Sequence, residues 1–237
     1  MAVLETKKIF QITKAALDAV FPEFCIRCEK EGELLCGQCR LQIQTKVLHE
    51  RCPFCERITS TGSVCRRCTR FESLDGAVAL AQYAELGVRR LLRNWKYASD
   101  VRCGSEIEKL IRRVLVNNYL PDLPWVIVPA SLHRARARQR GFDQAHELAD
   151  IIAKQTEWPI MDCLVRSKRT VPQARAGQNR AQVGQLRGIY RVTGQAPEYV
   201  LLIDDVLTTG ATLDAAAHEL KQAGSECVWA LTMARGT

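Results

Sequence analysis

The sequence has few aromatic residues and no long apolar run. Aromatic side chains make up 6% of the 237 residues, which argues against a platform on which nucleobases stack. No stretch approaches the roughly twenty apolar residues that a membrane-spanning helix requires. The apolar residues near the N-terminus are interrupted by Gln11, Lys14 and Asp18, and no small-residue cleavage pattern follows them. We therefore expect a cytoplasmic protein with no export signal and no inserted membrane segment.

Acidic residues are missing from two stretches, residues 133–142 and residues 163–197. The basic residues there are Arg134, Arg136, Arg138 and Arg140 in the first stretch and Arg166, Lys168, Arg169, Arg175, Arg180, Arg187 and Arg191 in the second. Guanidinium groups grip pyrophosphate with paired hydrogen bonds, although a solvated basic loop is the alternative for either stretch. The second stretch is rich in Gln, Ala and Gly, so we expect a mobile flap over a site rather than core. The net charge of +8 favours anionic partners, which include phosphates, nucleotides and nucleic acid.

The N-terminal segment, residues 1–24, carries apolar residues at helical spacing. Ile9, Ile12, Ala16 and Val20 fall on one face of a helix. We expect an amphipathic helix that packs on its own protein. A helix lying on a membrane surface is the alternative, but the polar face is short and mixed in charge.

Residues 25–70 contain four identical Cys-x-x-Cys pairs. Their cysteines are Cys25, Cys28, Cys36, Cys39, Cys52, Cys55, Cys65 and Cys68. Two such pairs complete a four-thiolate zinc site, so eight ligands predict two structural Zn²⁺ ions. A disulfide framework suits secreted proteins, and four tandem copies argue against a redox pair. Sequential pairing of neighbouring pairs is favoured over a crossed arrangement because it closes shorter loops.

The segment that holds these pairs has few large apolar residues, so zinc must supply much of its folding free energy. We expect that loss of one metal site unfolds this double zinc ribbon without abolishing the rest of the fold. Three further cysteines, Cys103, Cys163 and Cys227, have no paired neighbour in the sequence and are predicted to be buried apolar residues.

After the cysteine pairs, strand-like and helix-like segments alternate up to the C-terminus. Strands are predicted at residues 76–83, 125–128, 200–203 and 227–234, and helices around residues 88–95, 107–115, 144–155 and 213–222. This alternation predicts an α/β fold with a doubly wound, mainly parallel sheet over residues 71–237. Ligands of such sheets bind at the carboxyl ends of the strands.

The most informative stretch is residues 199–213, YVLLIDDVLTTGATL. An apolar strand runs into Asp204 and Asp205, and a loop of small residues, Thr208 to Thr212, leads into a helix. Backbone N–H groups at a helix N-terminus bind phosphate, and Gly210 lets the backbone close on the anion. Carboxylates accept hydrogen bonds from ribose hydroxyls, so one loop suits a whole ribose 5-phosphate. An ordinary strand-to-helix turn with a capping Thr is the alternative.

This stretch resembles the phosphoribosyl-pyrophosphate (PRPP) loop of the type I phosphoribosyltransferases. The resemblance covers Asp204, Asp205, Val206, Leu207, Thr208, Thr209, Gly210, Ala211 and Thr212. It implies that the acid pair, as the catalytic residues, binds the ribose and that Thr208–Thr212 bind the 5-phosphate. It also implies that Mg²⁺ accompanies the pyrophosphate, with Ser131, Arg134 and Arg140 nearby.

The order of segments resembles the competence protein F (ComF) family, in which a double zinc ribbon precedes RQRGFDQA, here residues 138–145, and the PRPP-type loop. Lys96-Tyr97 also matches a recurring pair of that family, which implies that Lys96 lies at the phosphate site. The sequence departs from the family pattern at Asp143, where Asn is usual, and at Gln182 and Gln185.

The ComF resemblance implies a PRPP- or nucleotide-binding protein that acts in DNA uptake during natural transformation, together with DNA-uptake or recombination proteins. Two alternatives stay open. One is a non-catalytic protein that binds single-stranded DNA through the phosphate cradle and the basic stretches, and the other is a nucleotide-salvage phosphoribosyltransferase. The sequence identifies no catalytic base and no acceptor.

Overall fold

The structure is a computed structural model that describes residues 22–43, 48–70, 72–97, 101–114, 116–130, 142–167, 186 and 188–236. Its helices are α2 (Gly37–Gln42), α3 (Leu86–Tyr97), α4 (Val101–Ile111), the 3-10 helix η1 (Val116–Tyr119), α6 (Gln144–Thr156) and α8 (Ala211–Gln222). Its strands are β1 (Gly76–Gln82), β2 (Val126–Pro129), β3 (Leu164–Arg166), β4 (Tyr190–Val192), β5 (Tyr199–Leu207) and β6 (Cys227–Arg235). The predicted N-terminal helix falls on residues 1–21, which lie outside the described residues. Within the described part, no helix has the length and apolar content to cross a membrane.

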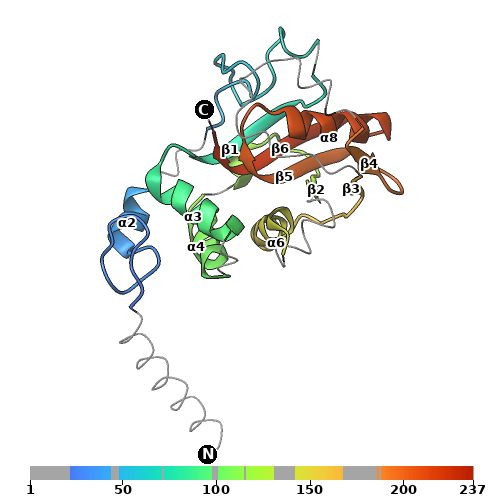
Figure 1. Cartoon of the computed structure of the whole chain (residues 1–237). Helices are drawn as coiled ribbons and strands as arrows, with labels where there is room; N and C mark the ends of the chain where they lie inside the picture. Colours follow the sequence, from blue (N-terminus) through green and yellow to red (C-terminus); the bar gives the residue numbers. More distant parts are fainter. Residues whose placement is uncertain are drawn as a thin grey trace, which may run out of the picture.

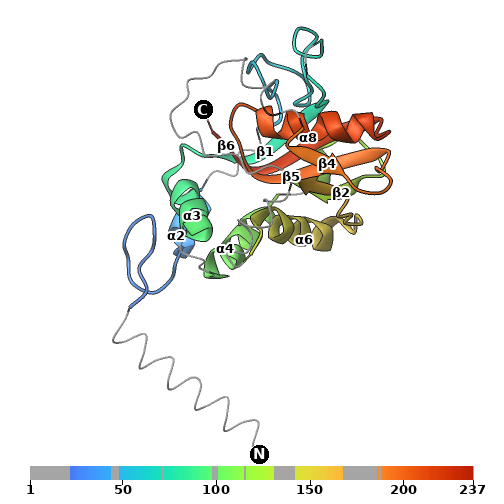
Figure 2. The same ribbon diagram turned by 45° about the vertical axis from the view of Figure 1, so that its right-hand side comes forward.

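A four-stranded parallel sheet in the order β1-β6-β5-β2 forms the centre of the molecule. In the two views of Figures 1 and 2, α8 covers one face of the sheet and α3, α4 and α6 lie on the other. Strands connected through helices that lie on both faces confirm the predicted doubly wound α/β fold. All four predicted strands and all four predicted helices are present, with shifted ends.

Burial on both faces explains the uninterrupted apolar run of β5. Successive side chains of a strand point to opposite faces. Leu201 and Ile203 belong to the core formed with α3, α4 and α6, whereas Val200 and Leu202 belong to the core formed with α8. No polar side chain fits such a strand until it leaves the two cores at Asp204.

A small antiparallel pair, β3 with β4, packs beside α8. It shows that the prediction of a flap over residues 163–197 is wrong in part. Residues 163–197 were predicted to be mobile rather than core. Cys163, Leu164, Ile189 and Tyr190 are nevertheless buried in the core beneath α8, because the apolar residues at both ends of the stretch pair with each other. The basic middle of the stretch, residues 168–185, lies outside the described residues.

The two cysteine groups lie against different parts of the α/β domain. The first, near the N-terminus, packs beside α3 and α4, and the second lies at the β1 edge near the end of β6 (Figure 1). Leu48, just before the second group, and Ser63, between its two cysteine pairs, form antiparallel bridges to Ala79 and Gly76 of β1. The second group therefore covers a sheet edge that would otherwise offer unpaired backbone groups.

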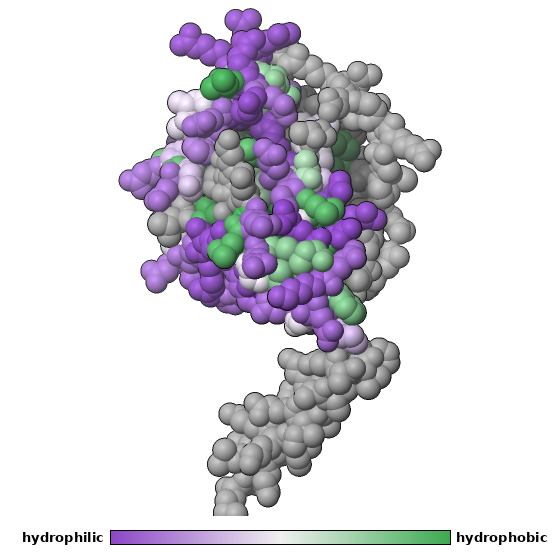
Figure 3. Space-filling model, turned by 90° about the vertical axis from the view of Figure 1, so that its left-hand side faces the viewer, coloured by the Kyte–Doolittle hydropathy of each residue, from purple (hydrophilic) through white to green (hydrophobic). Residues whose placement is uncertain are grey.

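The first cysteine group shares its core with the α/β domain. Leu35 and Ile43 are fully buried in the cluster that contains Leu91 and Trp95 of α3. The outward face on that side of the molecule is largely hydrophilic, with scattered apolar patches (Figure 3). The segment is thus not an independent ribbon, because its few large apolar residues are buried against α3 and α4.

Among the three cysteines outside the Cys-x-x-Cys pairs, Cys103 and Cys163 are buried as predicted. Cys227 is half-buried because it is the first residue of β6, where the strand starts at the surface. Burial raises the pKa of the Cys227 thiol to about 11, with the charge of Asp75 as the next cause.

We expect Leu35→Ala to destabilise the whole domain by about 2–5 kcal/mol, the usual cost of a buried leucine truncated to alanine. Denaturant unfolding of the zinc-loaded protein, followed by tryptophan fluorescence, measures this change because Trp95 lies in the same cluster. Leu41→Ala is the matched control, since Leu41 is 74% exposed and should change stability by less than about 0.5 kcal/mol. An unchanged tryptophan transition in Leu35→Ala would show that the first cysteine group unfolds independently.

Candidate functional site

The carboxyl end of β5 and the turn into α8 form a small hollow with a volume of about 30 Å³. It is lined by Asp204, Val206, Leu207, Thr208, Gly210, Thr212 and Leu213. These residues all belong to the PRPP-like stretch of the sequence, and the hollow holds one or two water-sized groups. The strand is longer than predicted, because the acid pair lies inside β5 rather than after it. Asp204 and Asp205 are therefore held on an extended backbone next to β6.

Gly210 shapes the start of α8. Its φ angle is +79°, a left-handed conformation that favours glycine. A Cβ atom on Gly210 would also lie 2.8 Å from Cε1 of Phe54. Because Gly210 caps the helix without a side chain, α8 begins at Ala211, two residues earlier than predicted, with no side-chain cap. Gly210, Thr212 and Leu213 at the start of this helix line the hollow, where an anion is favoured by the helix dipole.

The acid pair is joined to α3 through Lys96. Lys96 Nζ lies 2.5 Å from Asp205 Oδ2, and the Asp205 backbone N–H donates to Asp204 Oδ1 at 2.8 Å. Lys96 stands in the last turn of α3, so the helix carries its ammonium group to the end of β5. Lys96, predicted at the phosphate site from the family resemblance, thus lies beside the acid pair.

The two carboxylates differ in their electrostatic environment. Burial raises the pKa of Asp204 to about 7, and the negative charge of Asp205 adds to this effect. The Asp205 backbone N–H and the Lys96 ammonium oppose the shift but do not cancel it. An ionised pair is therefore costly in the free protein, and hydroxyl donors or a cation at this position would relieve that cost.

Two residues near the acid pair have no motif in the sequence. Tyr190 of β4 is buried, and its hydroxyl has no hydrogen-bond partner among the described residues. Arg166 of β3 lies with its guanidinium carbon 5.6 Å from the centre of the Tyr190 ring. Burial, followed by the charge of Asp204, raises the pKa of Tyr190. Only the pairing of β3 with β4 brings these residues to the site, and no sequence pattern indicates that pairing.

The segment after β2 has a described part and an undescribed part. Ser131, Arg134, Arg136, Arg138 and Arg140 lie outside the described residues. Asp143, where the ComF pattern usually has Asn, accepts a hydrogen bond from the Ala145 backbone N–H at 3.0 Å and caps the N-terminus of α6. Aspartate is favourable there because it accepts the hydrogen bond and carries a negative charge at the positive end of the helix.

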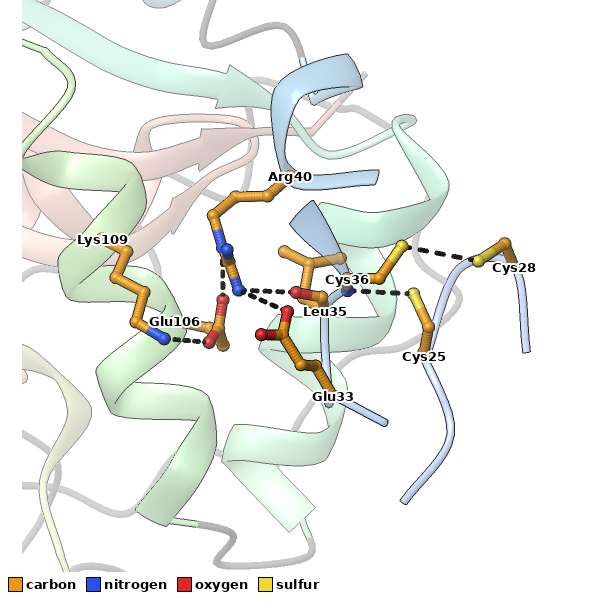
Figure 4. A network of polar contacts seen from close by, with 8 residues as sticks. All are labelled: Cys25, Cys28, Glu33, Leu35, Cys36, Arg40, Glu106 and Lys109. Atoms are coloured by element: carbon orange, nitrogen blue, oxygen red, sulfur yellow. Dashed lines mark hydrogen bonds and ion pairs between the residues drawn. The ribbon is translucent and has the colours of Figure 1, made fainter. Parts of the chain in front are cut away.

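The eight cysteines of the Cys-x-x-Cys pairs form two groups of four. Cys25, Cys28, Cys36 and Cys39 form one group, and Cys52, Cys55, Cys65 and Cys68 form the other, with all sulfur atoms of a group within 4.8 Å of one another. This confirms sequential pairing, and the four-thiolate sets fit structural Zn²⁺. In the first group, Cys28 and Cys36 sulfurs lie 3.7 Å apart (Figure 4). In the second group, the pKa of Cys65 is lowered to about 6, and the largest cause is a hydrogen bond from the Cys68 backbone N–H. A lowered pKa favours the thiolate, which is the form that binds metal.

Comparison with known families accounts for both parts of the chain. A double zinc ribbon domain matches residues 16–70, and a phosphoribosyl transferase domain matches residues 143–236. Competence protein ComFC of Bacillus subtilis is 27% identical over 204 residues, which cover 82% of this chain and 81% of that protein. Competence protein F of Haemophilus influenzae is 27% identical over 232 residues, which cover 89% and 96%. The chain thus resembles the ComF competence proteins over most of its length. Its phosphoribosyltransferase domain contains the whole hollow at the β5–α8 turn.

The ionisation of Asp204 should make the stability of the ligand-free protein depend on pH. Because the pKa is raised on folding, the folded state binds more protons than the unfolded state between about pH 4 and 7, and stability falls as pH rises through that window. Asp204→Asn removes this effect, so we expect the variant to be more stable than the wild type by about 1–3 kcal/mol at pH 8. The difference should shrink at pH 6.

Denaturant unfolding of metal-loaded, ligand-free protein at pH 6 and pH 8 measures this dependence. Asp122→Asn is the control, because Asp122 is exposed. A stability difference between Asp204→Asn and the wild type that is the same at both pH values would contradict the raised pKa of Asp204.

Proposed function

We propose that this chain binds a ribose 5-phosphate group, carried by PRPP together with Mg²⁺, at the turn from β5 to α8. We further propose that it acts in the use of imported DNA, the role for which the competence proteins that it resembles are named. The observation that carries the proposal is a combination of two features within a phosphoribosyltransferase domain. Two adjacent carboxylates lie near the end of β5, and α8 begins four residues beyond that strand with a glycine as its cap residue.

Residues in and around the hollow would divide the ligand between them. The N–H groups at the start of α8 and the exposed Thr208 and Thr209 hydroxyls would hold the 5-phosphate. Asp204 and Asp205 would accept hydrogen bonds from the ribose hydroxyls. Lys96 Nζ pairs with Asp205 Oδ2 at 2.5 Å, while Asp204, with its raised pKa, gains most from the arrival of hydroxyl donors.

The donor set also fits Mg²⁺, which prefers hard oxygen ligands and one or two carboxylates beside a bound phosphate. Asp204 and Asp205 would be the carboxylates nearest to it. When bound, Mg²⁺ neutralises charge on pyrophosphate as it leaves. Ser131, Arg134 and Arg140, proposed for the pyrophosphate from the family resemblance, lie outside the described residues.

The double variant Asp204→Asn with Asp205→Asn should weaken the binding of PRPP by at least about 1–3 kcal/mol, because it removes buried hydrogen bonds to charged groups. Titration calorimetry with Mg²⁺ measures the affinity. The control is Asp122→Asn with Asp150→Asn, which removes the same charge at two exposed positions. Equal affinity of the double variant and the wild type would show that the acid pair is only structural.

Release of pyrophosphate from PRPP in the presence of each nucleobase separates an enzyme from a binding protein. Pyrophosphate released only with a base would identify a phosphoribosyltransferase and would support a salvage role. Binding of PRPP without release would support a ligand-binding role.

Binding of single-stranded DNA is the second candidate, and the position of the second cysteine group favours it. Arg66, Arg67 and Arg70 are all exposed on this group, whose Phe54 touches the phosphate-binding turn at Gly210. A strand whose 5-phosphate occupied the hollow could extend across these arginines. Because the attraction is to backbone phosphates, we expect weak and sequence-tolerant binding that falls steeply with salt.

Replacement of Arg66, Arg67 and Arg70 by Ala should weaken the binding of a 5-phosphorylated oligonucleotide. It should also flatten the plot of log affinity against log salt by about 0.7 for each phosphate that the variant no longer neutralises. Fluorescence anisotropy at several salt concentrations measures both quantities. The control removes the same charge from the exposed Lys30, Arg112 and Lys154. If both triple variants behave alike, the second cysteine group does not bind DNA.

A further inference from the structure

The second cysteine group and the residues just after it contact the phosphate-binding turn, residues 208–212, and its neighbours β6 and α8 at three separate points. They are a ring contact to Gly210, hydrogen bonds to the end of β6, and hydrogen bonds to the first turn of α8. The two four-thiolate sites, equivalent in sequence, therefore differ in what they hold in place.

The ring contact comes from inside the Cys52-x-x-Cys55 turn. Phe54 lies between these two cysteines, and its ring packs against the space that a Gly210 side chain would occupy, 2.8 Å from an ideal Cβ position. Phe54 is partly buried against the core beneath α8. The turn that supplies two thiolates to the second site thus also backs the residue that starts α8.

The second attachment is Arg235, the last residue of β6. It is 5% exposed, and its Nη2 donates to the carbonyl oxygens of Cys52 at 3.1 Å and Pro53 at 3.2 Å. The next residue, Gly236, donates its N–H to the Leu207 carbonyl at 2.8 Å, at the start of the phosphate-binding turn. Arg235 is thus bound to the cysteine turn, and Gly236, the next residue in the chain, is bound to Leu207.

The third attachment is Asp214, in the first turn of α8. This carboxylate is 2% exposed, and its Oδ1 accepts hydrogen bonds from the Ser73 N–H at 2.6 Å and the Leu74 N–H at 3.1 Å. Ser73 and Leu74 follow Cys68, the last ligand of the second group, within six residues. Both ends of the second cysteine segment are therefore bound to the turn or to the helix that follows it.

The first cysteine group is attached elsewhere. Arg27 pairs with Glu85 at 3.0 Å, Arg90 donates to the Ile26 carbonyl at 2.6 Å, and Arg40 pairs with Glu106 at 2.8 Å (Figure 4). These contacts hold α3 and α4. Within α3, Arg90 lies about 9 Å along the helix axis from Lys96, which pairs with Asp205.

We propose that the second four-thiolate site, with Phe54 as the positioning residue, preorganises the phosphate-binding turn. Its metal occupancy and the binding of a ribose 5-phosphate ligand then strengthen each other, whereas the first site takes little part in this coupling. The inference rests on the proposed function. Residues 52–68 have few buried apolar residues of their own, so their fold depends on metal. Loss of the metal releases Phe54 and the Cys52 and Pro53 carbonyls, and with them the support of Gly210.

Coupling between two binding sites is reciprocal and typically amounts to a 5- to 150-fold change in affinity. We therefore expect Phe54→Ala to weaken the binding of ribose 5-phosphate by about 5-fold or more in calorimetry while both zinc ions are retained. Phe24→Ala is the matched control, because Phe24 precedes the first cysteine group and is 52% exposed. It should leave the affinity unchanged.

The role of the metal is tested by replacing one cysteine ligand in each of the two sites. Cys55→Ser and Cys28→Ser each remove the second, exposed cysteine of a first pair, and each should lower the zinc content from two to one per chain. We expect a larger loss of ribose 5-phosphate affinity in Cys55→Ser. If the two variants bind equally well, the coupling is absent.

Two further measurements do not depend on ligand binding by a variant. Saturating ribose 5-phosphate should slow the release of one of the two zinc ions of the wild type to a chelator by about 5-fold or more. Equal release rates with and without the ligand would overturn the coupling.

Hydrogen exchange of ligand-free Phe54→Ala should be faster than that of the wild type at the amides of residues 208–213. Unchanged exchange there would overturn the positioning role of Phe54. A wild type that binds neither ribose 5-phosphate nor PRPP overturns the proposed function and the ligand coupling together, whereas normal ligand binding by Phe54→Ala and Cys55→Ser overturns this inference alone.

Discussion

The structure depends on the burial of β5 on both of its faces. A central strand covered by α8 on one side and by α3, α4 and α6 on the other must be apolar until its carboxyl end. Asp204 and Asp205 occupy the first positions beyond that limit, so they are polar groups at the border of a water-poor interior. This placement raises the pKa of Asp204 and gives hydrogen bonds to the pair more effect than they would have on an exposed loop.

The elements around β5 converge on this border from distant parts of the chain. Lys96 comes from the end of α3, Tyr190 and Arg166 come from the β3–β4 pair, and Phe54 comes from the second cysteine group. In Figures 1 and 2 the second cysteine group lies near the end of β6, on the same side of the sheet as the start of α8. The cysteine segments are consequently structural supports of the α/β domain, and the two support different sides of it.

Local sequence determined much of the fold and of the turn. The Cys-x-x-Cys spacing predicted both metal groups and their pairing, since the ligands of each group are close in sequence. The apolar run of β5 predicted a buried strand, and the pattern of Asp, Thr and Gly predicted a turn for a phosphate group. Gly210 confirms the need for glycine at the start of α8. Each of these features depends on residues that are near neighbours in the chain.

Tertiary structure alone decided which distant residues meet at the turn. The sequence contains Phe54, Arg235 and Asp214 without any spacing that relates them, because their contacts join segments separated by more than 100 residues. It predicted a double zinc ribbon over residues 25–70 but not how that segment packs, with Leu35 and Ile43 buried in the same core as α3. The physical reason is that short, apolar-poor segments cannot form a core alone and must pack on a larger domain. Local pattern therefore predicted the β5–α8 turn and the two cysteine groups, and packing decided that one group lies against α3 and the other against that turn.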